Sequence, residues 1–248
     1  MKLGAQFYSI RDNTQTPEDL YRAFKEIKSI GYEIVQMSAI CDIDPKLLKS
    51  YSDEFALPIT CTHSPYDRII NDTDALINEH KIYGCPTIGL GYMPNEYHGD
   101  GIYKFIDTLR EPLRKIKAAG LDFAYHNHAF EFESVDGKLI YDILIDELPE
   151  LSFIVDTYWI KYAGYDFIEY VKRLGADRIK NVHFKDMKTD PKGEICPCGE
   201  GVIDFDPLIK LCDEMGIENA LVEQDNAPDS GNSIGEMKKS YENLKSLF

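Results

Sequence analysis

Residues 125–133, YHNHAFEFE, place two histidines and two glutamates within nine positions. They follow the apolar run LDFA, where an ordinary strand would end in a turn. Imidazole nitrogens and carboxylate oxygens bind divalent metal ions, and both groups also transfer protons in catalysis. The stretch therefore raises the question of whether this strand end presents metal ligands, catalytic groups or both.

Three later stretches each end in a further potential metal ligand. Asp156 closes FIVD, His183 lies in NVHFKD, and Glu223 closes ALVE. Each has an ordinary explanation when taken alone, because an Asp is often a helix cap and a His can be a hydrogen-bonded core residue. A carboxylate at an inward strand end, however, needs a partner. Together they predict a mixed oxygen and nitrogen site for a divalent metal ion, with Mn²⁺ as the first expectation and Mg²⁺, Co²⁺ or Zn²⁺ as alternatives.

Such a site needs a scaffold that brings several strand ends together. Short β-rich runs alternate along the chain with longer amphipathic stretches. Residues 16–31 are typical of a helix, with Thr16 as N-cap, Pro17 at the first helical position and Gly31 at the end. The strands we expect are residues 3–8, 33–38, 58–63, 87–92, 122–127, 152–156, 179–185 and 220–224.

Eight strand-then-helix units in 248 residues predict an α/β protein, a single (β/α)8 TIM barrel that spans residues 1–248 as one domain. A doubly wound open sheet is the alternative. The dinucleotide fingerprint G-x-G-x-x-G does not follow the first strand, so the sequence gives no local support for a nicotinamide or flavin site. In TIM barrels the active site lies at the carboxyl ends of the strands, where the candidate ligands fall.

Composition narrows the function classes. With Lys+Arg 27 against Asp+Glu 43, the net charge of -16 argues against nucleic acid and anionic membranes as partners. No apolar run approaches the roughly 20 residues that cross a bilayer, and the start lacks the features of a signal peptide, so we expect a cytoplasmic protein. The six scattered cysteines are expected to be free thiols. The sequence is compatible with a homo-oligomer and does not require one.

Several stretches together resemble a known family over nearly the whole chain. They are QFYSIRD, AYHNHAFEF, IVDTYWIKYAGYD, NVHFKD, GEGVIDF and VEQDNAPDSGNSIGEMKKSYENLK. With them the chain resembles the xylose isomerase-like TIM-barrel superfamily, in the group labelled sugar phosphate isomerase/epimerase, which also holds inosose dehydratases and tagatose 3-epimerase-like enzymes. No phosphate-cradling glycine loop is present, so the resemblance does not imply a phosphorylated substrate.

The resemblance implies that Asp156, His183 and Glu223 bind the metal ion. The fourth ligand in that superfamily is normally a Glu at the end of the fifth strand, and here the chain departs from the pattern. His126 stands at roughly that position, and the nearest carboxylate is Glu131, five residues later. Either Glu131 folds back to complete the set, or an imidazole replaces the carboxylate. We expect Glu131 to be the ligand.

The implied chemistry starts from a metal ion that binds a carbonyl and the adjacent hydroxyl and so acidifies the C–H bond between them. We expect Glu131 and Glu223 to be catalytic and Lys185 to neutralise the developing oxyanion. The residues expected to contact a small sugar are His63, His126, His128 and Trp159. The predicted function is a metal-dependent isomerase or epimerase that acts on a sugar or keto-sugar through an enediolate. A lyase on a keto-sugar or keto-inositol is the alternative, and a metal-free binding module is a third class.

Overall fold

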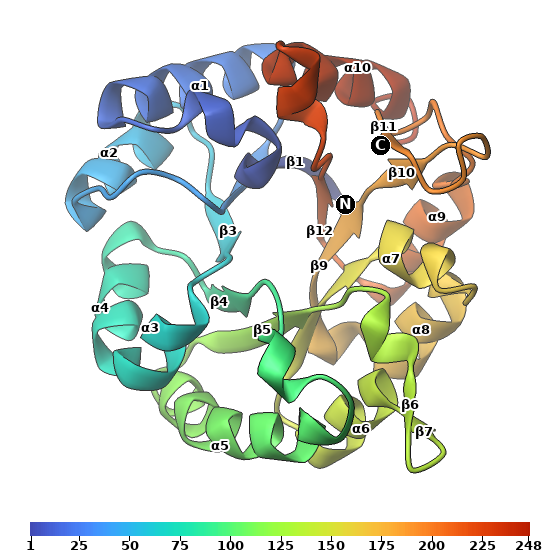
Figure 1. Ribbon diagram of the computed structural model, residues 1–248. Coiled ribbons are helices and arrows are strands. Elements are labelled where there is room, and N and C mark those ends of the chain that lie inside the picture. The colour runs from blue at the N-terminus through green and yellow to red at the C-terminus, as the bar shows by residue number, and fades with distance from the viewer.

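The computed structural model describes residues 1–248 and shows eight parallel strands in a nearly closed barrel with helices around it (Figure 1). The barrel strands are β1 (Lys2–Gln6), β2 (Ile34–Met37), β3 (Ile59–Thr62), β4 (Thr87–Leu90), β5 (Asp122–His126), β8 (Ser152–Asp156), β9 (Ile179–Phe184) and β12 (Asn219–Val222). Their order in the sheet is β3-β2-β1-β12-β9-β8-β5-β4. The predicted TIM barrel is confirmed, and each strand overlaps one of the expected ranges.

The barrel closes between β3 and β4, where pairing is reduced to one isolated bridge between Ser64 and Leu90. The Ser64 backbone N–H donates a hydrogen bond to the Gly89 carbonyl at 2.8 Å. A Cβ on Gly89 would lie 2.1 Å from the Thr62 carbonyl oxygen and 3.0 Å from Cys61 Sγ. The two strands can therefore approach this closely only because residue 89 has no side chain.

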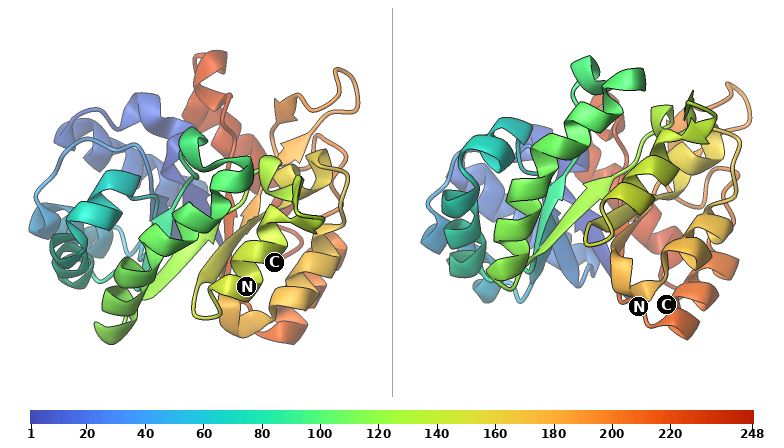
Figure 2. Two further views of the ribbon diagram at one scale, coloured as in Figure 1. Left: turned by 60° about the horizontal axis from the view of Figure 1, so that its bottom comes forward. Right: turned by 90° about the horizontal axis from the view of Figure 1, so that it is seen from below.

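The helices lie outside the barrel, and both chain termini lie at one end of it (Figure 2). They are α1 (Pro17–Ile30), α2 (Pro45–Glu54), α3 (Tyr66–Asn71), α4 (Thr73–Tyr83), α5 (Ile102–Ala118), α6 (Ile140–Glu147), α7 (Thr157–Tyr162), α8 (Phe167–Leu174), α9 (Asp206–Met215) and α10 (Ser233–Leu244). Two of them, α3 and α7, were not expected from the sequence. None of the helices is both long and apolar enough to cross a membrane.

The largest apolar core lies between the strands and the helices and includes Phe24 of α1 and Phe105 of α5, which are fully buried. A separate small cluster joins Cys61, Ala124 and Ile154 from three strands inside the barrel. Because alternate residues of a strand face the same side, the residues two positions after Ala124 and Ile154 also face the barrel interior. These are His126 and Asp156, each the last residue of its strand.

A buried carboxylate organises the long loop that follows β9. Asp186 begins the short strand β10 (Asp186–Met187), which pairs with β11 (Ile195–Cys196). Its two oxygens accept hydrogen bonds from the backbone N–H groups of Met187, Gly199, Gly201 and Ile203 at 2.8 to 3.0 Å. One side chain therefore fixes both ends of the loop beside the barrel mouth.

Candidate metal centre

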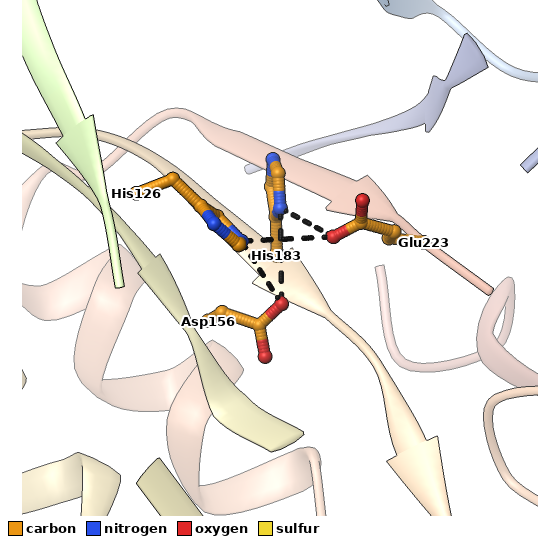
Figure 3. A group of neighbouring side chains, drawn as sticks. All are labelled: His126, Asp156, His183 and Glu223. Carbon is orange, nitrogen blue, oxygen red and sulfur yellow. Dashed lines mark hydrogen bonds and ion pairs between the residues drawn. The ribbon is translucent and has the colours of Figure 1, made fainter. Parts of the chain in front are cut away.

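Four buried side chains converge at the carboxyl ends of neighbouring strands (Figure 3). His126 ends β5, Asp156 ends β8, His183 lies on β9, and Glu223 directly follows β12. Strand register brings them to one level, because Asp156 pairs with His183 and the Glu223 backbone N–H bonds to the Phe184 carbonyl. Each residue offers one ligand atom, and the four atoms lie within 4.8 Å of one another.

The carboxylate oxygens stand directly opposite the imidazole nitrogens. His183 Nδ1 lies 2.9 Å from Glu223 Oε2 and 3.9 Å from Asp156 Oδ2. His126 Nε2 lies 3.2 Å from Asp156 Oδ2 and 3.7 Å from Glu223 Oε2. Four ligands about 2.1 Å from a single metal ion lie roughly 3–4 Å apart, so these separations match the spacing that one ion requires.

The second nitrogen of each ring, which faces away from the two carboxylates, forms a hydrogen bond that fixes the orientation of the ring. His126 Nδ1 donates to the Gly91 carbonyl at 3.2 Å, and His183 Nε2 donates to Gln36 Oε1 at 2.7 Å. Burial lowers the pKa of His126 to about 3, which keeps that ring neutral at neutral pH. In neutral His126 the unprotonated Nε2 therefore faces Asp156, and Nδ1 of His183 faces Glu223.

The outer oxygens of the two carboxylates are also occupied. Gln6 Nε2 donates to Glu223 Oε1 at 2.8 Å, and the Trp159 backbone N–H donates to Asp156 Oδ1 at 3.0 Å, which caps α7. Burial raises the pKa of Asp156 to about 6. Burial also acts to raise the pKa of Glu223, but the Lys185 ammonium, 3.8 Å from Oε2, helps to hold it well below its usual range. One oxygen of each carboxylate therefore remains for the centre.

This donor set fits a divalent cation. Two ring nitrogens and two carboxylate oxygens face one another, so a stable arrangement needs either a proton on the facing nitrogen or a cation between the atoms. The mixture of imidazole and carboxylate ligands suits Mn²⁺, Zn²⁺, Co²⁺ and related ions. The hydrogen bonds to the outer ring atoms are those that typically orient metal-binding histidines.

The structure does not bring Glu131 into this group. Its Oε1 accepts a hydrogen bond from the Tyr125 hydroxyl at 2.5 Å, and its Oε2 accepts one from the His128 backbone N–H at 2.7 Å. Burial raises the pKa of Glu131 to about 7. Tyr125 belongs to the core outside the barrel, so its partner Glu131 lies away from the inward-facing His126. The geometry favours the second reading of this segment, in which His126 takes the place of the expected carboxylate.

A pocket of about 520 Å³ lies beside the candidate centre. Three of the predicted substrate-contacting residues, His63, His126 and His128, line it together with Lys185 and Glu223. The rings of His63 and His126 are 5.1 Å apart, and His63 Nε2 is buried without a hydrogen-bond partner. The fourth predicted contact, Trp159, lines an adjoining cavity instead.

Lys185 is buried at the pocket wall and is 1% exposed. Its Nζ donates to Asp225 Oδ2 at 2.6 Å and lies 4.9 Å from the centre of the Trp159 ring. Burial alone would lower the pKa of Lys185, but Glu223 and other nearby carboxylates outweigh it and raise the pKa above its usual value. The ammonium group therefore stays charged next to the candidate centre.

Sequence reasoning missed Gln36, which orients His183. Its signal was a polar residue inside the apolar strand β2, where all four residues are buried. Gln6 ends β1, and its contact with Glu223 depends on the pairing of β1 with β12, which brings the two ends of the chain together. Only the closed barrel makes these two glutamines part of the same site.

An eight-stranded parallel barrel with acidic and imidazole side chains gathered at one mouth defines the class, a TIM-barrel protein with a candidate metal centre. The chain belongs to the xylose isomerase-like TIM barrel family, whose model matches residues 24–247.

Curated relatives and solved structures agree with that assignment. The chain is 29% identical over 163 residues to an inosose dehydratase from Clostridium perfringens, covering 56% of this chain and 53% of that protein. It is 23% identical over 251 residues to an inosose dehydratase from Lacticaseibacillus casei, covering 83% of each. The chain thus spans about half the length of the first of these relatives. A crystal structure of a sugar phosphate isomerase/epimerase from Parabacteroides distasonis has a TM-score of 0.80 at 21% identity, covering 99% of this chain and 98% of that one.

Proposed function

We propose that the protein is a metal-dependent enzyme that removes a proton next to the carbonyl group of a keto-sugar and returns it, as an isomerase or epimerase does. One observation carries the proposal: one ring nitrogen each of His126 and His183 and one oxygen each of Asp156 and Glu223 meet beside a pocket of about 520 Å³. A divalent ion held there supplies the positive charge that acidifies a C–H bond next to a carbonyl.

The chain's own residues supply binding and proton transfer. Lys185 stays charged beside the centre and stabilises negative charge that develops on a substrate oxygen. His63 and His128 line the pocket, and burial lowers their pKa values, so their neutral rings can form hydrogen bonds with substrate hydroxyl groups. Glu223 keeps its proposed role as a ligand and proton-transfer group. Glu131 acts at a distance, because it holds the His128 backbone N–H and so positions the loop.

The pocket favours an uncharged sugar. Lys185 is the only Lys or Arg among its thirteen lining residues, and its ammonium group is already paired with Asp225. A phosphate group is typically bound by free cationic side chains or by backbone N–H groups at a helix start. The proposed substrate is therefore a keto-sugar without a phosphate group.

Loss of water is the second candidate outcome, and the similarity to two inosose dehydratases favours it. The same proton abstraction gives isomerisation when the proton returns to a neighbouring carbon, epimerisation when it returns to the opposite face, and elimination when a β-hydroxyl group leaves. The candidate centre and the charged Lys185 would serve all three outcomes.

Incubation of the Mn²⁺-loaded protein with keto-sugars and a keto-inositol in deuterated water tests the proposal. NMR should show that deuterium enters at carbon next to the carbonyl, with an isomer or epimer formed. An unsaturated or deoxy product would instead establish the dehydratase. Absence of both exchange and product with every substrate, in protein shown to hold its metal ion, would contradict the proposed enzyme class.

A further inference from the structure

A second cavity adjoins the pocket of about 520 Å³ described above, which we call the central pocket. The walls of this second cavity are aromatic, and we call it the aromatic cavity. It measures about 300 Å³ and is lined by rings of Tyr92, His98, His128, Phe130 and Trp159. Tyr92 and His128 also line the central pocket, so the two spaces share a wall. The rings of His98 and Phe130 are stacked with centres 3.8 Å apart, and the His128 ring lies 5.2 Å from the Trp159 ring.

The aromatic cavity carries no fixed charge. None of its eight lining residues is Asp, Glu, Lys or Arg, although the chain contains 43 acidic and 27 basic residues. The central pocket, by contrast, is lined by Lys185, Glu223 and Asp225. Aromatic side chains bind the flat face of another ring, and a cavity without charge binds an uncharged group best.

Exposure of Tyr92 supports a role in binding. This residue is 55% exposed and lines both spaces. Its ring is not part of the apolar core and its hydroxyl makes no hydrogen bond, so neither folding contact explains why an aromatic residue stands here.

The position of the cavity adds a second argument. His128 forms part of both walls, and its ring lies 4.8 Å from the ring of His126 at the candidate centre. A group in the aromatic cavity would therefore lie directly beside the reacting sugar.

From these observations we infer that the substrate is a glycoside, with the reacting sugar in the central pocket and a second, uncharged ring in the aromatic cavity. This inference rests on the proposed function for the identity of the first ring. It goes beyond the proposed function in one respect: binding of the second ring in the aromatic cavity, away from the reacting carbons, determines which substrates the enzyme accepts. The second ring is either another sugar or an aryl group, because the apolar C–H face of a sugar and the flat face of an aryl ring both pack against aromatic side chains.

Binding measurements test the inference without using activity. The Mn²⁺-loaded protein is titrated with methyl and phenyl glucosides and galactosides that carry a ketone at one ring carbon, and with cellobiose and lactose oxidised in the same way on the non-reducing sugar. Fluorescence of Trp159, the only tryptophan of the chain, reports occupancy of the aromatic cavity, and calorimetry gives the affinity. A two-ring ligand should bind about tenfold more tightly than its methyl glycoside and should change Trp159 fluorescence. Preference for phenyl glycosides identifies an aryl group, and preference for disaccharides identifies a second sugar.

Variants locate the effect. His98→Ala and Phe130→Ala, at residues that line the aromatic cavity and not the central pocket, should reduce the preference for two rings to about twofold or less while methyl glycosides bind as before. Tyr103→Ala, an exposed tyrosine on α5 outside both spaces, is the matched control and should keep the full preference. Equal binding of one-ring and two-ring ligands, a preference that survives both variants, or no binding by the whole panel would overturn the inference. A preference that is present in a protein without keto-sugar chemistry would instead refute only the proposed reaction.

Discussion

Glu131 and His126 illustrate what a sequence can and cannot decide about a single side chain. Strand alternation predicts that His126 faces the barrel interior, and the structure agrees. Whether Glu131 folds back to the same point depends on the turn Phe130–Phe132 and on the buried Tyr125 hydroxyl that binds its carboxylate. Nothing in the spacing of YHNHAFEFE encodes those contacts. The expected ligand Glu131 therefore stays a prediction that the geometry does not favour.

The buried Glu131 predicts a pH-dependent stability of the metal-free protein. Its pKa is raised from 4.5 to about 7 by burial, so between these pH values the folded state holds a proton that the unfolded state has lost. The contribution of Glu131 to the free energy of unfolding should therefore fall by roughly 3 kcal/mol as pH rises from 4.5 to 7. Urea unfolding of the wild type and of Glu131→Gln across this range measures the difference.

Other buried groups titrate in both proteins, so only the difference between them isolates Glu131. His63, His126 and His128, with lowered pKa values, act in the opposite direction, because they hold fewer protons in the folded state. A difference between wild type and Glu131→Gln that stays flat from pH 4.5 to pH 7 would show that the carboxyl titrates normally.

The barrel strands position the site residues as the sequence predicted, but the sequence did not predict helix α7, which begins at the site. Asp156, His183 and Glu223 were expected to meet because the carboxyl ends of parallel strands share one barrel mouth, and they do meet. Helix α7 was missed because it begins immediately after β8, with no intervening loop. Asp156 is both the last strand residue and the N-cap of this helix, so one residue serves as cap and candidate ligand.

The loop after β9 should depend on Asp186 rather than on its own hairpin. Asp186→Ala removes the acceptor of four backbone N–H groups and should lower the free energy of unfolding by at least about 3 kcal/mol. Hydrogen exchange should also rise at Gly199 and Gly201. The control is Glu200→Ala, an exposed residue of the same loop, which should change stability by less than about 0.5 kcal/mol. Equal effects of the two substitutions would show that Asp186 does not hold the loop.

At the scale of the whole molecule, eight expected strands that alternate along the chain with eight expected helices were enough to predict the barrel. The sequence could not show where the barrel is weakest. That seam lies between β3 and β4, where one bridge replaces a full ladder and Gly89 leaves no space for a side chain. His63 follows β3 at this seam and lines the central pocket, so closure and the site are linked.

Gly89→Ala tests that link. The added methyl group would meet the Thr62 carbonyl at 2.1 Å, and separation of β3 from β4 should cost about 2–3 kcal/mol or more in the free energy of unfolding. Gly120→Ala is the control, because its φ of +79° strains an alanine by about 1–2 kcal/mol while the methyl group meets no atom within 4 Å. Thermal unfolding compares them. A Gly89→Ala protein as stable as Gly120→Ala would contradict the importance of the seam.

Calorimetric titration of Mn²⁺ into chelator-treated protein tests the central claim that His126, Asp156, His183 and Glu223 form one metal site. The wild type should bind one ion per chain. His126→Ala should weaken binding by about 100-fold or more, because it removes a ligand, whereas Glu131→Gln should bind nearly as the wild type does. Circular dichroism confirms that each variant is folded. Loss of Mn²⁺ binding in Glu131→Gln with unchanged binding in His126→Ala, or no binding by the wild type, would contradict the account.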